Sequence, residues 1–157
     1  MEKTQEWVGW FRHASPYINS QRNQVLVIAL GGEALLHANL DNIIHDISLL
    51  NSLGIRLVLV FGARPQIDSI LKKNKIVSQF HHNLRVTEEH LIVHVLEAYG
   101  RARSELEAKL SMGVINSPMH GAKLKVVSGN YVMAKPYGVI DGVDLGLTGN
   151  VRSIDST

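Results

Sequence analysis

The sequence predicts an α/β fold, and three observations support this prediction. Two apolar runs with strand composition, residues 25–30 and 55–61, are separated by residues with helical periodicity. Residues 88–112 carry a second, longer helical pattern. The residues after 123 alternate between apolar and polar side chains around turn-forming glycines, which is typical of β-hairpins. We therefore expect a mainly parallel sheet with hairpins in the C-terminal part.

Composition excludes several classes of protein. The 157 residues are 45% hydrophobic and 19% charged, as in one ordinary globular domain. Cysteine is absent, which rules out disulfides and thiolate metal sites. The net charge is +2 and the basic residues are scattered, so we expect no nucleic-acid partner. No apolar run approaches the roughly 20 residues of a membrane span, and no signal peptide is recognisable. A cytoplasmic location without a membrane partner is expected.

The N-terminus is predicted to be an amphipathic helix over residues 1–20, ahead of a lobe over residues 21–157. Within residues 4–18, apolar side chains recur at helical spacing, and both tryptophans of the chain, Trp7 and Trp10, lie there. Two interpretations remain open. The helix either packs on its own domain or docks on another subunit, because aromatic anchors are enriched at interfaces.

A βαβ unit is predicted over residues 25–61. The continuous apolar run 25–30 is typical of a parallel strand that is covered on both faces. The helical stripe that follows ends before Gly54, which is expected to terminate the helix in a left-handed conformation. The second strand, 55–61, leads to Pro65, which the first turn of another helix tolerates.

The longest predicted helix covers residues 88–112, with Thr87 as its N-cap. Its apolar stripe consists of Ile92, Val95, Leu96, Tyr99, Ala102, Leu106 and Leu110. Glu97–Arg101 and Glu105–Lys109 are expected i,i+4 ion pairs. Such a helix either spans the domain or meets its copy in a dimer, and Gly100 would permit a close helix contact. Farther along, hairpin turns are predicted at residues 128–130 and 148–150.

Two glycine turns are the candidate ligand site. Gly31 and Gly32 follow the first strand, and Gly62, Ala63 and Arg64 follow the second. Ligands of open α/β sheets bind at the carboxyl ends of parallel strands, where glycine lets backbone N–H groups approach an anion. The two turns together could cradle an anion, although glycine also serves strand-to-helix turns for their geometry alone. The Walker and G-x-G-x-x-G patterns are absent.

Arg85 is a further candidate, because a guanidinium can grip a carboxylate with two hydrogen bonds. Taken alone, an arginine at position 85 is more often a surface residue. His90 and His94 have the i,i+4 spacing of zinc ligands but lack a third ligand, and His81-His82 is interpreted as a solvated loop. We expect no metal site and no catalytic residue, since no nucleophile or acid–base pair is recognisable.

Seven stretches, in order over nearly the whole chain, resemble the amino-acid kinase family. They are FRHASPYIN, VIALGGEAL, LLNSLGIRLVLVFGARPQID, NLRVTEEH, LSMGVINSP, GAKLKVVSGNYVMAKPYGVIDGVD and GNVRSID. Within the family they look most like the kinase-like domain of bacterial N-acetylglutamate synthases, with acetylglutamate kinases as the nearest catalytic relatives.

The resemblance implies a three-layer αβα sandwich whose N-terminal lobe binds an acylamino acid. By this resemblance, Gly31 and Gly32 would lie beside the phosphates of a kinase, and Gly62, Ala63 and Arg64 beside the acylamino acid. Arg85, in the RVT motif, would grip its α-carboxylate. N-acetylglutamate, glutamate and arginine are the implied small-molecule partners.

Two departures from the kinases argue against phosphoryl transfer. Ala29 stands where active kinases carry a lysine, and their HGGGP has become FGARP. The chain is also too short for the nucleotide lobe and the acetyltransferase domain, so we expect no cofactor here, with acetyl-coenzyme A serving the parent enzyme. The remaining role would be assembly, regulation and a vestigial pocket, with self-association through residues 88–112 and the N-terminal helix. The alternatives are a working acylamino-acid kinase lobe and a scaffold without a ligand.

Overall fold

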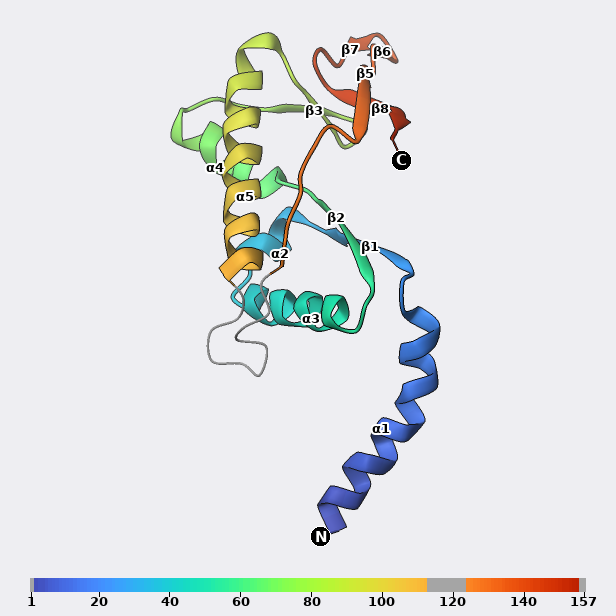
Figure 1. Ribbon diagram of the computed structural model, residues 1–157. Helices are drawn as coiled ribbons and strands as arrows, with labels where there is room; N and C mark the ends of the chain where they lie inside the picture. Colours follow the sequence, from blue (N-terminus) through green and yellow to red (C-terminus); the bar gives the residue numbers. More distant parts are fainter. Residues whose placement is uncertain (1, 113–123, 156–157) are drawn as a thin grey trace.

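The predicted βαβ unit forms the centre of the molecule. A computed structural model describes residues 2–112 and 124–155 of the chain (Figure 1). Strands β1 (Val25–Leu30) and β2 (Arg56–Phe61) are parallel and in register from end to end. Helices α2 (Gly32–Leu36) and α3 (Leu40–Ser52) connect them. Gly54 has a φ of +87°, which confirms it as the left-handed residue that ends α3.

The main core lies between one face of this sheet and two helices, α3 and α5 (Ile92–Met112). Its buried residues are Leu30, Leu40, Ile44, Ile47, Leu106 and Leu110. Partly buried side chains of both strands pack against them, Leu59 and Phe61 among them. The helical periodicity in the sequence thus corresponds to real burial against the sheet.

The other face of the β1–β2 sheet is open, so the prediction that strand 25–30 is covered on both faces is wrong for the described residues. Val27 is 60% exposed and Val60 is 54% exposed. Alternate residues of a strand point to opposite faces, and only the face that carries Ile28 and Leu30 meets the helices. A continuous apolar run therefore does not by itself show cover on both sides.

Helix α4 (Arg64–Lys73) begins where predicted, with Pro65 in its first turn. It packs against α5 and the short 3₁₀ helix η1 (Glu89–Leu91) through a second core cluster. The buried members of that cluster are Ile67, Leu71, Leu91 and Ala98. The second cluster holds the helix that follows the Gly62 turn in a fixed place beside the sheet edge.

Thr87 is not the N-cap that the sequence predicts. The residue before η1 is Glu88, and it makes no side-chain capping hydrogen bond. Thr87 instead forms a β-bridge with Gly146: its N–H donates to the Leu145 carbonyl over 3.2 Å, and its carbonyl accepts from the Leu147 N–H over 2.8 Å. Contacts with a distant segment have replaced a local cap.

Helix α5 presents two apolar faces rather than one. Ala102, Leu106 and Leu110 from the predicted stripe are buried, whereas Leu96 is 65% exposed. A side chain added at Gly100 would meet nothing within 4 Å, so the described residues provide no close helix contact there. Glu97 and Arg101 pair as predicted over 3.7 Å. Lys109, however, pairs with Asp41 of α3 over 2.6 Å instead of with Glu105.

The C-terminal part contains the expected antiparallel strands with different turns. Strand β5 (Val132–Pro136) pairs with β8 (Gly149–Ile154), and β6 (Val139–Ile140) pairs with β7 (Val143–Asp144). Both predicted turns are wrong, because residues 128–130 precede the strands and residues 149–150 lie inside β8. The tight turn is Asp141-Gly142, with φ of 48° and 80°, and Asp-Gly favours such a turn.

A third hairpin, β3 (Gln79–His81) with β4 (Leu84–Val86), carries the RVT motif. Among the described residues the strands form four two-stranded sheets, of which β1–β2 is parallel. The architecture is the mixed α/β fold that was predicted, with hairpins in the C-terminal part. The predicted stretch LSMGVINSP lies mostly outside the described residues.

Helix α1 (Glu2–Gln21) confirms the predicted N-terminal helix and extends away from the rest of the molecule (Figure 1). Trp7, Trp10 and Phe11 are 70%, 63% and 58% exposed. The interpretation that this helix packs on its own domain is therefore wrong for the described residues. None of the helices in residues 2–112 and 124–155 has the length and apolar character needed to cross a membrane.

Candidate ligand-binding site

The two glycine turns meet at the carboxyl edge of the parallel pair. The Gly62 N–H donates to the Leu30 carbonyl over 2.9 Å, which extends the β1–β2 ladder into both turns. A Cβ at Gly62 would lie 3.6 Å from the Gly32 nitrogen. The convergence that the sequence predicts for these glycines is therefore present.

Position 32 requires glycine because the first turn of α4 occupies the space that a side chain would need. A Cβ there would lie 2.6 Å from Pro65 Cδ and 2.8 Å from Gln66 Oε1. The Gln66 side-chain amide also donates to the Gly32 carbonyl over 2.9 Å. No sequence pattern pointed to Gln66, because its role depends on how closely α4 approaches the first turn.

Gly31 has an acidic neighbour. A Cβ at Gly31 would lie 3.0 Å from the Glu33 carboxylate, in the first turn of α2. A carboxylate at a helix N-terminus is stabilised there, but it repels a second anion. This first turn is consequently a poor place for a phosphate, which agrees with the absence of the kinase lysine at Ala29.

The second turn positions Arg64. Ala63, the residue before α4, is 1% exposed and makes no side-chain capping hydrogen bond. The Arg64 guanidinium donates from Nη2 to the Asn83 carbonyl over 2.5 Å and lies 5.3 Å from the centre of the Phe80 ring. Other N–H groups of the guanidinium fork remain for a ligand.

Arg85 is not a surface arginine, since it is only 9% exposed. Its Nη2 donates to Asp68 Oδ1 over 2.6 Å and its Nη1 donates to the Ser78 hydroxyl. The guanidinium carbon lies 4.7 Å from the centre of the Phe80 ring. Cross-strand register explains this contact, because Phe80 of β3 is paired with Arg85 of β4.

The two arginines therefore flank one aromatic ring, and Asp68 provides the opposite charge. Sequence analysis identified both arginines but missed Asp68, Ser78 and Phe80. Asp68 lies four residues after Arg64 on α4, one turn along the same helix face, and this spacing was a usable signal. The position of Phe80 needed the register of the β3–β4 hairpin, which the sequence does not reveal.

The RVT motif is anchored from behind by the C-terminal segment. The Thr148 hydroxyl donates to the Arg85 carbonyl and lies 2.9 Å from Thr87 Oγ1. Thr87 and Leu145 are both buried at this contact. These groups make up one end of the candidate site, called the pocket edge below: two glycine turns, two arginines against one ring, and the carboxylates of Asp68 and Glu33.

Comparison with known proteins decides the family. The amino acid kinase family matches residues 24–157. The chain belongs to the amino acid kinase family. Amino-acid acetyltransferases of Azotobacter vinelandii and Ectopseudomonas mendocina are 51% and 49% identical to it over 150 residues, which is 96% of this chain and 35% of each relative.

Two solved structures of N-acetylglutamate synthase from Neisseria gonorrhoeae share this amino acid kinase fold. One is complexed with coenzyme A and L-arginine; it has 35% sequence identity and a TM-score of 0.81, covering 94% of this chain and 35% of that protein. The other is complexed with coenzyme A and N-acetyl-glutamate, with 36% identity and a TM-score of 0.79 over 94% and 33% of the two chains. The chain thus spans about a third of the length of the relatives that it matches.

Proposed function

We propose that this chain is the kinase-like N-terminal lobe of an N-acetylglutamate synthase, the enzyme that makes N-acetyl-L-glutamate from acetyl-coenzyme A and L-glutamate as the first step of arginine biosynthesis. The observation that carries the proposal is the similarity along 94% of the chain to the gonococcal synthase, at a TM-score of 0.81. The lobe serves assembly and regulation and keeps a vestigial acylamino-acid pocket. Acetyl transfer does not reside in these residues.

The pocket edge supports an acylamino acid as its ligand class. Arg85 is buried and cationic, as a residue that recognises a carboxylate must be. Gln66 Oε1, beside Gly32, is buried without a hydrogen-bond partner in the part of the chain that the structure describes. An N-acylated amino acid supplies both complements, a carboxylate for the guanidinium and an amide N–H for this acceptor.

A ligand must compete with Asp68 for Arg85, and this competition gives the pocket its vestigial character. We expect Asp68→Asn to strengthen binding of N-acetylglutamate, because the variant removes the competing negative charge. Arg85→Ala should weaken binding by roughly 2–5 kcal/mol, which is the cost of truncating a buried charged partner. Arg56→Ala is the control, since Arg56 is exposed at the opposite end of β2 from Gly62, where its guanidinium donates to the Asn23 carbonyl.

The measurement is isothermal titration of each variant with N-acetylglutamate, glutamate and arginine, below the unfolding temperature of the least stable variant. Equal affinity in wild type and Arg85→Ala would show that the arginine has no part in recognition. If the wild-type chain binds none of these ligands even at millimolar concentration, assembly would be the only role left for the lobe.

Kinase activity is not expected. Ala29 offers a methyl group where phosphoryl transfer needs a cation, and Glu33 adds negative charge beside the first glycine turn. The purified chain should neither phosphorylate N-acetylglutamate with ATP nor acetylate glutamate from acetyl-coenzyme A. Turnover above a buffer blank in either assay, lost on Arg85→Ala, would contradict this.

Self-association is the second candidate role, and the exposed aromatic face of α1 favours it. Trp7, Val8, Trp10, Phe11 and Arg12 line an open apolar depression on this helix. On α5, Val93 and Leu96 are 61% and 65% exposed on the face away from the core. Apolar surface of this kind marks protein–protein contacts.

Light scattering at micromolar concentration should therefore report a dimer or larger species. Trp10→Ser and Leu96→Ser should shift the population towards monomer, whereas Val77→Ser, on an isolated side chain that is 86% exposed, should not. A monomer near 17.4 kDa for the unmodified chain would remove the assembly role from α1 and α5.

A further inference from the structure

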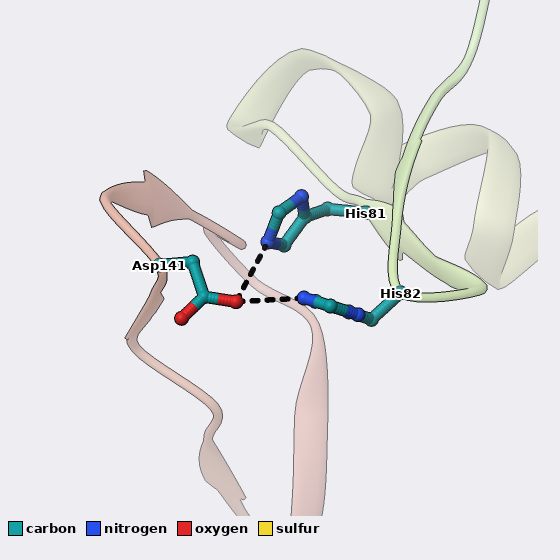
Figure 2. A group of neighbouring side chains, drawn as sticks. All are labelled: His81, His82 and Asp141. Carbon is teal, nitrogen blue, oxygen red and sulfur yellow. Dashed lines mark hydrogen bonds and ion pairs between the residues drawn. The ribbon is translucent and has the colours of Figure 1, made fainter.

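Two tight turns that are far apart in the sequence bring three metal-binding side chains together. His82-Asn83 is the two-residue turn of the β3–β4 hairpin, with φ of 47° and 62°. Asp141-Gly142 is the turn of the β6–β7 hairpin, again with two positive φ values. Figure 2 shows His81 and His82 directed towards Asp141 across the space between the hairpins. The cluster lies outside the arginine–phenylalanine group described above.

The donor atoms stand close enough together to share one metal ion. His82 Nε2 lies 2.7 Å from Asp141 Oδ2, and His81 Nε2 lies 3.9 Å from the same oxygen. One ligand atom from each residue falls within 4.8 Å of the others. Ligand atoms of a tetrahedral ion at about 2.0–2.1 Å stand roughly 3.3 Å apart, between the two measured distances.

An ion pair alone does not account for the cluster. His82 and Asp141 have side chains that are 61% and 70% exposed, and exposed ion pairs contribute little. His81 Nε2 is buried and has no hydrogen-bond partner among the described residues. At 3.9 Å, Asp141 is too distant for a hydrogen bond to that nitrogen. An ion between the three side chains would satisfy the His81 nitrogen and both partners at once.

We propose that His81, His82 and Asp141 bind a divalent transition-metal ion of the zinc class. Two imidazoles and one carboxylate suit Zn²⁺, Co²⁺ or Ni²⁺, whereas Mg²⁺ and Ca²⁺ prefer oxygen ligands throughout. The neighbouring residue Asn83 is held by the Arg64 guanidinium, which steadies the turn that carries His82. The bound ion joins the β6–β7 hairpin to the β3–β4 hairpin and leaves a coordination position open to solvent.

The test uses the full chain without a histidine tag, titrated with Zn²⁺ by calorimetry and with Co²⁺ by visible absorption. The variants are His81→Gln, His82→Asn and Asp141→Asn; asparagine tolerates the left-handed backbone at positions 82 and 141, so the turns survive. The control is His90→Gln, which removes an exposed histidine that lies 3.3 Å from Glu88 and is spaced i,i+4 from His94. Circular dichroism verifies that each variant folds.

We expect a 1:1 complex with the intense absorption of tetrahedral Co²⁺, and at least about a tenfold loss of affinity in each of the three variants. His90→Gln should bind like wild type. No binding by wild type at millimolar Zn²⁺, unchanged affinity in His82→Asn or Asp141→Asn, or loss in His90→Gln would each overturn the assignment. The last result would place the ion on the His90–His94 pair instead.

Discussion

Gly32 and Gly62 follow equivalent strands, yet their surroundings give them different tasks. At Gly32 a Cβ would overlap the Pro65 ring carbon, at 2.6 Å, and Gln66 Oε1, at 2.8 Å. Neither neighbour can retreat easily, because Pro65 belongs to the first turn of α4 and Gln66 donates to the Gly32 carbonyl. At Gly62 the nearest atom to a Cβ is 3.6 Å away, an ordinary contact. The first glycine is required for packing, whereas the second is not.

Gly32→Ala should therefore lower the free energy of unfolding by about 1–3 kcal/mol, as overpacking does. Gly62→Ala is the matched control and should change it by no more than about 0.5 kcal/mol. Urea denaturation of both variants provides the measurement. Equal losses would mean that the turns need glycine for backbone conformation and not for the approach of α4.

Arg85 shows how far single residues can be predicted from sequence. Its charge and its place in the RVT motif identified it, and its burial against Phe80 and Asp68 did not follow from either. The partners come from another strand and from α4, so only the register of β3–β4 and the position of α4 bring them together. Neither the register of β3–β4 nor the position of α4 can be predicted from the residues next to Arg85.

At the scale of elements, periodicity predicted the helices better than the strands. The predicted α3 stripe became a buried face because it packs against the sheet and α5. Strand β1 is apolar on both faces but buried on one. The apolar run therefore predicted that a strand forms there, but not which of its faces is covered. Thr87 has the chemistry of an N-cap, yet its pairing with Gly146, 59 positions along the chain, outweighs that preference. The predictions of the C-terminal turns were wrong because three glycine-containing stretches could each form a tight turn. Of the three, Asp141-Gly142 is the one that joins the paired strands β6 and β7.

The same type of substitution, leucine to alanine, compares a buried and an exposed position of helix α5. Leu106 is 5% exposed in the main core, and Leu96 is 65% exposed and belongs to neither core cluster. Leu106→Ala should lower the free energy of unfolding by about 2–5 kcal/mol, since it leaves a cavity. Leu96→Ala should stay within about 0.5 kcal/mol when measured at concentrations where the chain is monomeric. A large loss for Leu96→Ala in monomer would show that this face is covered within the chain.

At the scale of the whole molecule, one short segment attaches the C-terminal hairpins to the RVT motif. Leu145 is fully buried, Gly146 forms the bridge with Thr87, and the Thr148 hydroxyl donates to the Arg85 carbonyl. Residues from both ends of the lobe therefore determine where Arg85 lies. The proposed metal ion would add a second connection between the same two hairpins, through His82 and Asp141.

Gly146→Ala should detach this segment. Gly146 has a φ of +60°, and a Cβ there would lie 2.5 Å from the Thr87 carbonyl oxygen. Gly138→Ala is the matched control, because Gly138 has a φ of +78° and a Cβ there would meet nothing within 4 Å. Both variants carry the strain of a left-handed alanine, about 1–2 kcal/mol, so any difference between them reports the contact with Thr87.

Hydrogen exchange of the Thr87 and Leu147 amides, which donate across the bridge, should accelerate in Gly146→Ala and change far less in Gly138→Ala. Binding of any pocket ligand should weaken in step with that exchange, since Arg85 is held from behind by the same segment. Equal protection of both amides in the two variants would show that the hairpins are attached elsewhere and that the bridge is incidental.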